Sequence, residues 1–308
     1  MSRILNTIII ILLLVSSAFL FWTYYNQLPS EQRQFLVSSN EELNVNATNQ
    51  LSMFMENMRF DTNNISYSFA ECNKKSQDKM KQAFQIVSND TGNIYFYESQ
   101  SAKIIIYCSQ QKGEQRNTTF VAGEGGPNKV ILLDLYPLIV DGKIYLYKQE
   151  NEENCEYPVV ELHELMHVFG FDHINKTNEI LYPYVNCEQR ITPDIINELK
   201  SLYAEKPKVD LTLQNLSAIM HGKYLNFNVT ILNRGLISTT NVSLKVSSAE
   251  KTIETIEIDD LSPGISQIIT VKNILVKTNN QDNITFKVTT NEEEYFYENN
   301  QLTANLQQ

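Results

Sequence analysis

The sequence predicts two folded units of different classes, an α+β unit and then an all-β sandwich, preceded by a transmembrane helix. Three observations support this order. Residues 4–25 are largely apolar, residues 59–205 mix strand and helix patterns, and residues 208–308 show mainly the two-residue alternation of strands. A chain of 308 residues is long enough for two domains, and 42% hydrophobic residues supply packed cores, which excludes a disordered chain.

The N-terminal segment has the features of a membrane anchor. The run from Ile4 to Trp22 is close to the roughly 20 residues that span a bilayer. Arg3 precedes it and the next basic residue is Arg33, so the positive-inside tendency predicts a cytoplasmic N-terminus. A cleaved signal peptide is the competing interpretation, although no clear Ala-x-Ala site follows the run. Both interpretations place the folded units outside the cytoplasm.

Residues 26–58 form a predicted stalk. They are rich in Asn, Gln, Ser and Glu and contain few apolar residues. Near the end of the stalk, Leu51, Phe54, Met55 and Met58 make a short amphipathic patch. The spacing predicts either a short helix or a segment that packs on the following domain.

The α+β unit is predicted from alternating and helical patterns. Alternation predicts a strand at residues 65–69, and helical spacing predicts a helix over Ser76–Val87. Further strands are predicted at residues 94–97, 103–107, 130–135 and 143–147, with a bulky apolar run at Ile104–Ile106. Gly123–Pro127 is predicted to be a loop, and Asp141-Gly142 a turn between the last two strands.

Three of the four histidines fall in the pattern HExxHxxGxxH. Residues four apart share one face of a helix, so His163 and His167 can direct their imidazoles to one point. Gly170 can adopt the left-handed conformation that ends a helix and turns His173 back as a third ligand. Glu164 is placed to hold a metal-bound water and take its proton. Three protein ligands leave one position open, which predicts one catalytic Zn²⁺.

The alternative is a helix that carries scattered histidines. Against it, the extended pattern fixes the residue at five positions, and the surrounding sequence has a helix start and stop. Pro158 suits the first helical position, and the apolar residues that follow surround the helix on most sides, which predicts burial.

This pattern resembles the zinc signature of the metzincin metallopeptidases, and within them the matrixins. The resemblance implies that His163, His167 and His173 bind zinc and that Glu164 is the general base. It also implies a metzincin-like catalytic domain with a mixed sheet, an active-site helix and a C-terminal helix. The helix predicted over Ile191–Tyr203 looks like the last of these elements.

Two positions depart from the matrixin pattern. Matrixins often carry Met-Tyr-Pro after the third histidine, and the matching residues are Leu181-Tyr182-Pro183, so Leu181 replaces the methionine. Ile174 stands where matrixins usually have a small hydroxyl residue. Leucine and methionine have similar volumes, so we expect Leu181 to be an apolar packing residue below the metal. Neither departure removes a ligand or the base.

All four cysteines lie in the α+β unit, which allows two disulfides outside the cytoplasm. We favour Cys155–Cys187, because these residues flank the histidine helix and the segment that matches Met-Tyr-Pro. Cys72–Cys108 follows by elimination. Reduced, buried cysteines are the alternative.

Residues 208–308 resemble a CARDB domain, an Ig-like sandwich of about seven strands. The resemblance depends on four short motifs: Asp210-Leu211, Asn233-Arg234-Gly235, Leu261-Ser262-Pro263-Gly264 and Glu298-Asn299-Asn300. The domain is expected to be either a module that binds a surface polymer or protein, or a passive spacer or stabilising neighbour of the α+β unit.

The net charge of −11 and the absence of a basic stripe argue against a nucleic-acid partner. The prediction is a membrane-anchored, extracytoplasmic zinc endopeptidase that cleaves proteins or peptides. An edge strand, expected at Val130–Leu135, would bind the substrate in extended form. The alternatives are an adhesion protein with a zinc-stabilised, non-catalytic scaffold, and a protein that cuts only its own stalk.

Overall fold

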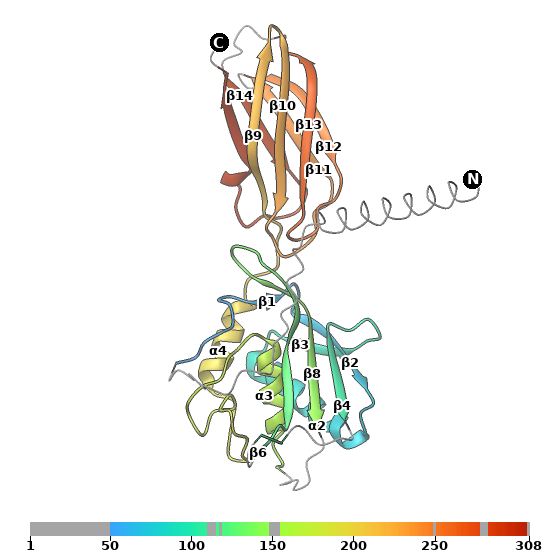
Figure 1. Ribbon diagram of the computed structural model, residues 1–308, viewed down its shortest axis with the longest axis vertical. Helices are drawn as coiled ribbons and strands as arrows, with labels where there is room; N and C mark the ends of the chain where they lie inside the picture. Colours follow the sequence, from blue (N-terminus) through green and yellow to red (C-terminus); the bar gives the residue numbers. More distant parts are fainter. Residues whose placement is uncertain are drawn as a thin grey trace, which may run out of the picture. The chain divides into compact units, whose positions relative to one another are not determined.

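The computed structural model describes residues 50–109, 115–116, 119–147, 155–248, 251–277 and 283–306. The predicted membrane span, residues 4–25, and most of the predicted stalk lie outside these ranges. In the part of the chain that is described, no helix is both long and apolar enough to cross a membrane. An α+β domain contains the elements from β1 (Arg59–Phe60) to α4 (Pro193–Leu202), and a β-sandwich contains those from β9 (Leu211–His221) to β15 (Gln301–Asn305) (Figure 1).

The α+β domain is built on a six-stranded mixed sheet with the order β1-β8-β4-β2-β3, and β7 pairs with β8. The strands are β1 (Arg59–Phe60), β2 (Asn64–Ala70), β3 (Tyr95–Glu98), β4 (Ile104–Ser109), β7 (Gly123–Ile131) and β8 (Leu138–Tyr147). A separate small hairpin joins β5 (Gln115–Arg116) to β6 (Thr119–Phe120). The pairs are parallel except β7, which runs antiparallel to β8. Among the described residues β7 pairs only with β8, so its other edge is free.

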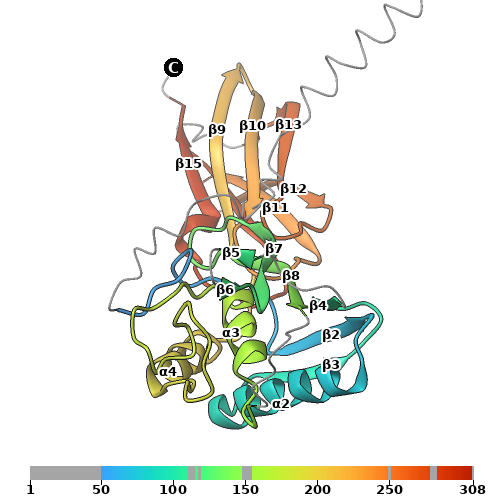
Figure 2. The same cartoon turned by 60° about the horizontal axis from the view of Figure 1, so that its bottom comes forward.

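Helices α2 (Lys74–Thr91) and α3 (Val159–Val168) pack against the sheet and against each other (Figures 1 and 2). The Asn73 side chain accepts a hydrogen bond from the Ser76 N–H and begins α2, and Gly92, with φ +70°, ends it. The buried residues of α2 include Met80, Ala83, Phe84 and Val87. The predicted helix is therefore confirmed, and capping makes it longer at both ends than its apolar stripe.

Helix α4 (Pro193–Leu202) confirms the predicted final helix. Its C-terminus is joined to the sheet by Arg59, which is fully buried. The Arg59 guanidinium donates to the Leu202 and Glu205 carbonyls and lies 4.6 Å from the centre of the Tyr203 ring. The buried positive charge of Arg59 is thus hydrogen-bonded to backbone carbonyls at and just after the C-terminal end of α4.

Two expectations about glycine-containing segments are wrong. Gly123–Pro127, expected to be a loop, is the first half of β7, and β8 runs straight through the expected turn at Asp141-Gly142. A Cβ on Gly125 would lie 2.3 Å from the Glu164 carbonyl oxygen, and one on Gly142 would lie 2.6 Å from Val168 Cγ1. These glycines therefore mark close approach of strand backbone to α3, where a side chain does not fit. The chain turns between Ile131 and Leu138 instead.

Both favoured disulfides are confirmed. Cys72–Cys108 joins the start of α2 to β4, with Cα atoms 4.8 Å apart. Cys155–Cys187 has a Cα separation of 5.2 Å and joins the segment before α3 to the loop before α4. The second bridge thus closes the segment that contains all three histidines of the HExxHxxGxxH pattern.

The C-terminal domain is an antiparallel sandwich of a three-stranded sheet, β13-β10-β9, and a four-stranded sheet, β12-β11-β14-β15. The strands are β9 (Leu211–His221), β10 (Tyr224–Asn233), β11 (Val242–Ser248), β12 (Lys251–Ile258), β13 (Ser266–Leu275), β14 (Asn283–Thr289) and β15 (Gln301–Asn305), with a short helix η1 (Glu298–Asn300) before β15. Phe227 and Phe286, from different sheets, pack at 4.8 Å between ring centres. The predicted seven-stranded sandwich is confirmed.

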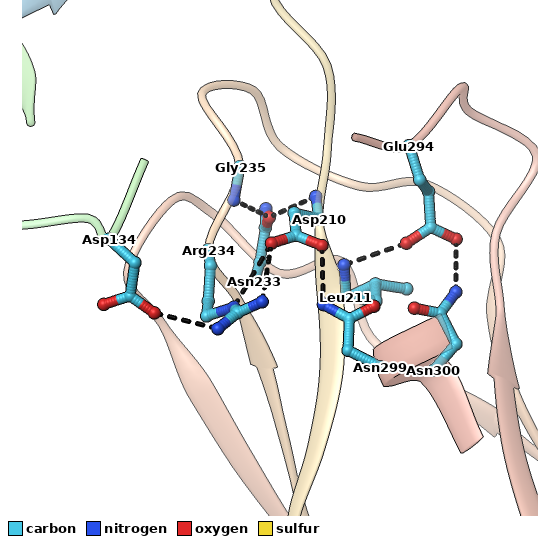
Figure 3. Close-up of polar contacts among 9 residues, drawn as sticks. All are labelled: Asp134, Asp210, Leu211, Asn233, Arg234, Gly235, Glu294, Asn299 and Asn300. Carbon is cyan, nitrogen blue, oxygen red and sulfur yellow. Dashed lines mark hydrogen bonds and ion pairs between the residues drawn. The ribbon is translucent and has the colours of Figure 1, made fainter. Parts of the chain in front are cut away.

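The four motifs behind the CARDB resemblance meet in one polar network, and Figure 3 shows the contacts among three of them. The buried Asn233 side chain donates to the Leu261 carbonyl at 2.9 Å and accepts from the Gly235 and Asp210 N–H groups. The Asp210 carboxylate pairs with Arg234 at 3.1 Å and accepts from the Asn299 side chain at 2.8 Å. Polar groups from segments far apart in the sequence therefore meet their hydrogen-bonding requirements with one another, near the ends of the strands.

Glu294 belongs to the same network. It is 5% exposed and accepts hydrogen bonds from the Leu211 N–H and the Asn300 side chain. Its burial raises the pKa of the carboxyl group above the ordinary value. Arg234 also forms an ion pair with Asp134 of the α+β domain at 2.8 Å (Figure 3).

A substitution at Gly125 tests the close packing of β7 on α3. Gly125→Ala should destabilise the fold by about 1–3 kcal/mol, because the new methyl group must push the strand from the Glu164 backbone. Gly126→Ala is the matched control, since a Cβ there meets no heavy atom within 4 Å. Urea denaturation measures both variants. Equal stability of the two would contradict this packing.

Candidate metal site

Three imidazoles converge beside the sheet. His163 and His167 lie one turn apart on α3, and their Nε2 atoms are 3.0 Å from each other. The Nε2 atom of His173, in the loop after α3, is 3.2 Å from that of His167. The candidate ligand atoms of the three residues all lie within 4.8 Å of one another. All three predicted ligand positions are thus brought together.

The other ring nitrogens of the two helical histidines are held by backbone carbonyls. His163 Nδ1 lies 2.6 Å from the Ile180 oxygen, and His167 Nδ1 lies 2.8 Å from the Phe171 oxygen. A carbonyl only accepts, so each Nδ1 carries the proton and each Nε2 presents a lone pair. Neighbouring lone pairs at 3.0 Å repel each other unless a cation lies between them. This donor set therefore fits a metal that prefers imidazole nitrogen, as zinc does.

Burial keeps these imidazoles neutral. Desolvation is the largest cause of a lowered pKa at all three residues, and it lowers the pKa of His167 to about 4. The neighbouring histidines lower the pKa of His163 and His167 further, because one imidazolium disfavours another. At neutral pH the three side chains are in the form that coordinates a metal.

The turn that returns His173 to the site is fixed by Gly170. Its φ of +92° requires glycine, and a Cβ there would also lie 2.8 Å from Met58 Sδ. Beyond His173, the Ile174 N–H donates to the Leu181 carbonyl at 3.0 Å. Both of these residues are almost completely buried in the core of the domain. Burial in the core therefore explains why Ile174 and Leu181, the two departures from the matrixin pattern, are apolar.

Glu164 is placed on α3 opposite β7. It is 4% exposed, and a Cβ on Gly123 would lie 2.8 Å from its Oε1 atom. Burial raises the pKa of Glu164 to about 8, with the charges of Glu124 and Glu161 adding to the effect. A hydrogen bond from the Gly125 backbone opposes this shift, because it stabilises the carboxylate.

Several residues that build the site were not predicted. The sequence around Gly123 and Gly125 is typical of a loop, and the carbonyls of Phe171 and Ile180 have no sequence signature. The Phe54 ring stacks with the His167 ring, at 6.1 Å between centres. The amphipathic spacing that includes Phe54 was the only sequence signal for this contact. It predicted either a short helix or a segment packed on the following domain, and the structure shows the packed segment.

Comparison with known proteins agrees with this architecture. Residues 58–204 match the model of the matrixin family, and residues 208–305 match the model of the CARDB family. The chain thus has a matrixin-like domain followed by an all-β CARDB domain.

A solved structure similar to part of this chain is the CARDB domain of the PF1109 protein from Pyrococcus furiosus, which is described as a complex with di-metal ions. It shares 16% identity over 32% of this chain and 87% of that chain, with a TM-score of 0.27. No curated protein matches the chain.

The buried carboxyl group gives a pH-dependent prediction for the metal-free protein. The folded-state pKa of Glu164, about 8, exceeds its ordinary 4.5, so between these values the folded state binds more protons than the unfolded state. Stability contributed by this group therefore falls as the pH rises. Glu164→Gln should be nearly neutral at pH 4.5 and stabilising by on the order of 4 kcal/mol at pH 8. Chelator-treated protein in urea titrations at the two pH values measures this difference, and a gain independent of pH would contradict it.

Proposed function

We propose that this protein is a zinc-dependent endopeptidase in which His163, His167 and His173 hold one zinc ion and Glu164 is the general base. The observation that carries the proposal is the convergence of three imidazoles, two of which present Nε2 lone pairs, together with a buried carboxyl group on the residue next to His163. The match of residues 58–204 to the matrixin family supports a metallopeptidase-type domain.

A zinc ion bound by these residues would polarise the scissile carbonyl and, through its charge, lower the pKa of a water molecule and of Glu164. Glu164, held by the Gly125 backbone, accepts a proton from the attacking water and delivers it to the departing amine. The packing of Gly123 against this side chain, and of Gly125 against the Glu164 backbone, excludes bulk water from one side of the carboxylate.

The free edge of β7 supports the choice of an extended peptide as substrate. An extended chain can pair with this edge through main-chain hydrogen bonds. The edge strand is Gly123–Ile131 rather than the predicted Val130–Leu135. Because its glycines lie against Glu164, a peptide bound along this strand passes close to the general base.

Burial of Glu164 favours an enzyme over a non-catalytic scaffold. Removing a carboxyl group from water opposes folding, and burial of this one raises its pKa to about 8. A scaffold held together by zinc needs the three histidines, but it gains nothing from this carboxyl group. Cleavage of the protein's own stalk is a narrower form of the same enzymatic activity.

We also propose that the enzyme acts outside the cytoplasm, attached by the predicted transmembrane helix at residues 4–25. The two disulfides support this location, because such bridges persist in oxidising compartments. In this proposal the CARDB domain either binds a polymer or protein at the surface or separates the peptidase from its neighbours.

Metal content tests the ligand assignment. Full-length protein purified with zinc should contain one ion per chain, and His163→Ala, His167→Ala or His173→Ala should each lower the affinity sharply, because the site has three protein ligands. Mass spectrometry of bound metal measures the occupancy. Full occupancy in a variant that lacks all three histidines would refute the assignment.

Peptide hydrolysis tests the general base. Glu164→Ala should retain zinc and lose hydrolysis of a diverse peptide library by a factor of about 100 or more, because the carboxylate acts on water rather than on the metal. Hydrolysis by Glu164→Ala at the wild-type rate would rule out the proposed role of Glu164. Zinc binding without hydrolysis in the wild-type protein would favour the scaffold alternative.

A further inference from the structure

The segment Gln50–Met58, here called the N-terminal strap, lies across the loop that carries the third histidine. Most of this segment precedes residue 58, where the match to the matrixin family begins. The Phe54 N–H donates to the Gly170 carbonyl at 2.7 Å, and the Asp172 N–H donates to the Ser52 carbonyl at 3.0 Å. Met53 and Phe171 form an antiparallel bridge between these two bonds. The strap therefore pairs with Gly170, Phe171 and Asp172, the three residues that precede His173.

The strap is fixed to the domain by apolar side chains. Leu51, Met53 and Met55 pack against the core of the α+β domain. Met58 is 2% exposed, and its Sδ atom occupies the space beside Gly170 that a Cβ would need. The strap is thus held both before and after the point at which it crosses the loop.

Phe54 differs from its neighbours in the strap because its side chain is 43% exposed. Its ring is stacked with the His167 ring at an interplanar angle of 22°, with 6.1 Å between ring centres. This separation lies within the range of offset aromatic pairs. This position accounts for the partly exposed ring of Phe54, because the ring covers one side of His167, a candidate metal ligand.

We propose that the N-terminal strap is a positioning element of the metal centre. This proposal rests on the proposed function, because the strap acts on the zinc held by the three histidines. The main-chain bonds of the strap hold the Gly170–Asp172 loop, and the loop sets the position of His173. The Phe54 ring restricts the motion of His167 and the access of water and chelators to it. Together these contacts slow the loss of the metal.

Zinc release from the full-length protein tests this proposal. Phe54→Ala removes the ring and keeps the N–H group, whereas Phe54→Pro also removes the donor to the Gly170 carbonyl. Loss of groups that orient metal ligands commonly lowers metal affinity about 10–100-fold. We expect zinc transfer to a coloured chelator to be about 10-fold faster in Phe54→Ala, and faster again in Phe54→Pro.

Phe296→Ala is the matched control, because Phe296 is 45% exposed and lies in the CARDB domain. The thermal midpoint of each zinc-free variant separates positioning from a general loss of stability. We expect the zinc-free midpoints of Phe54→Ala and Phe296→Ala to change equally little, while only Phe54→Ala loses zinc faster.

The outcomes distinguish this proposal from the proposed function. A wild-type protein that binds no zinc would overturn the proposed function and the strap proposal with it. Stable zinc binding in the wild-type protein, with equal release rates in Phe54→Ala and Phe296→Ala, would overturn the strap proposal alone. A drop in the zinc-free midpoint confined to Phe54→Ala would also overturn it, because Phe54 would then act through the fold.

Discussion

The close packing of β7 on α3 is the contact on which the site depends. It brings strand backbone against the Glu164 backbone and side chain, which is possible because Gly123 and Gly125 have no side chains. The same contact buries Glu164, raises its pKa and supplies a backbone donor to its carboxylate. Within the part of the chain that the structure describes, it also leaves the second edge of β7 without a strand partner. Substrate binding and proton transfer are therefore arranged by one strand–helix contact.

The histidines are arranged by a second layer of contacts. The carbonyls of Phe171 and Ile180 set the tautomers of His167 and His163, and the buried Leu181 carbonyl holds the backbone next to His173. The Cys155–Cys187 disulfide closes the segment that contains all of these groups. Orientation of the imidazoles is thus a property of the fold, which lowers the entropy lost when a metal binds.

Elements with a strong local pattern were predictable from the sequence. The apolar stripe of α2, the alternation in β2, the apolar run in β4 and the spacing of the three histidines each identified their structure. Both disulfides have the pairing that the positions of the cysteines favoured. The start of β7 was not predictable, because glycines such as Gly123 and Gly125 are typical of a loop in the local sequence. They lie in a strand because β7 approaches Glu164 of α3 too closely for a side chain, which is a contact between distant residues. The contact of Phe54 with His167 was likewise hidden, since it joins residues more than a hundred positions apart.

The most direct test of the account is the coordination of zinc in the full-length protein, measured by X-ray absorption at the zinc edge. The account predicts three imidazole nitrogens and one oxygen at about 2.0–2.1 Å, with no sulfur neighbour, because all four cysteines are in disulfides. The spectrum should lose an imidazole contribution when His173 is replaced by alanine. A wild-type spectrum with sulfur ligands, or with fewer than three imidazoles, would contradict the proposed metal site.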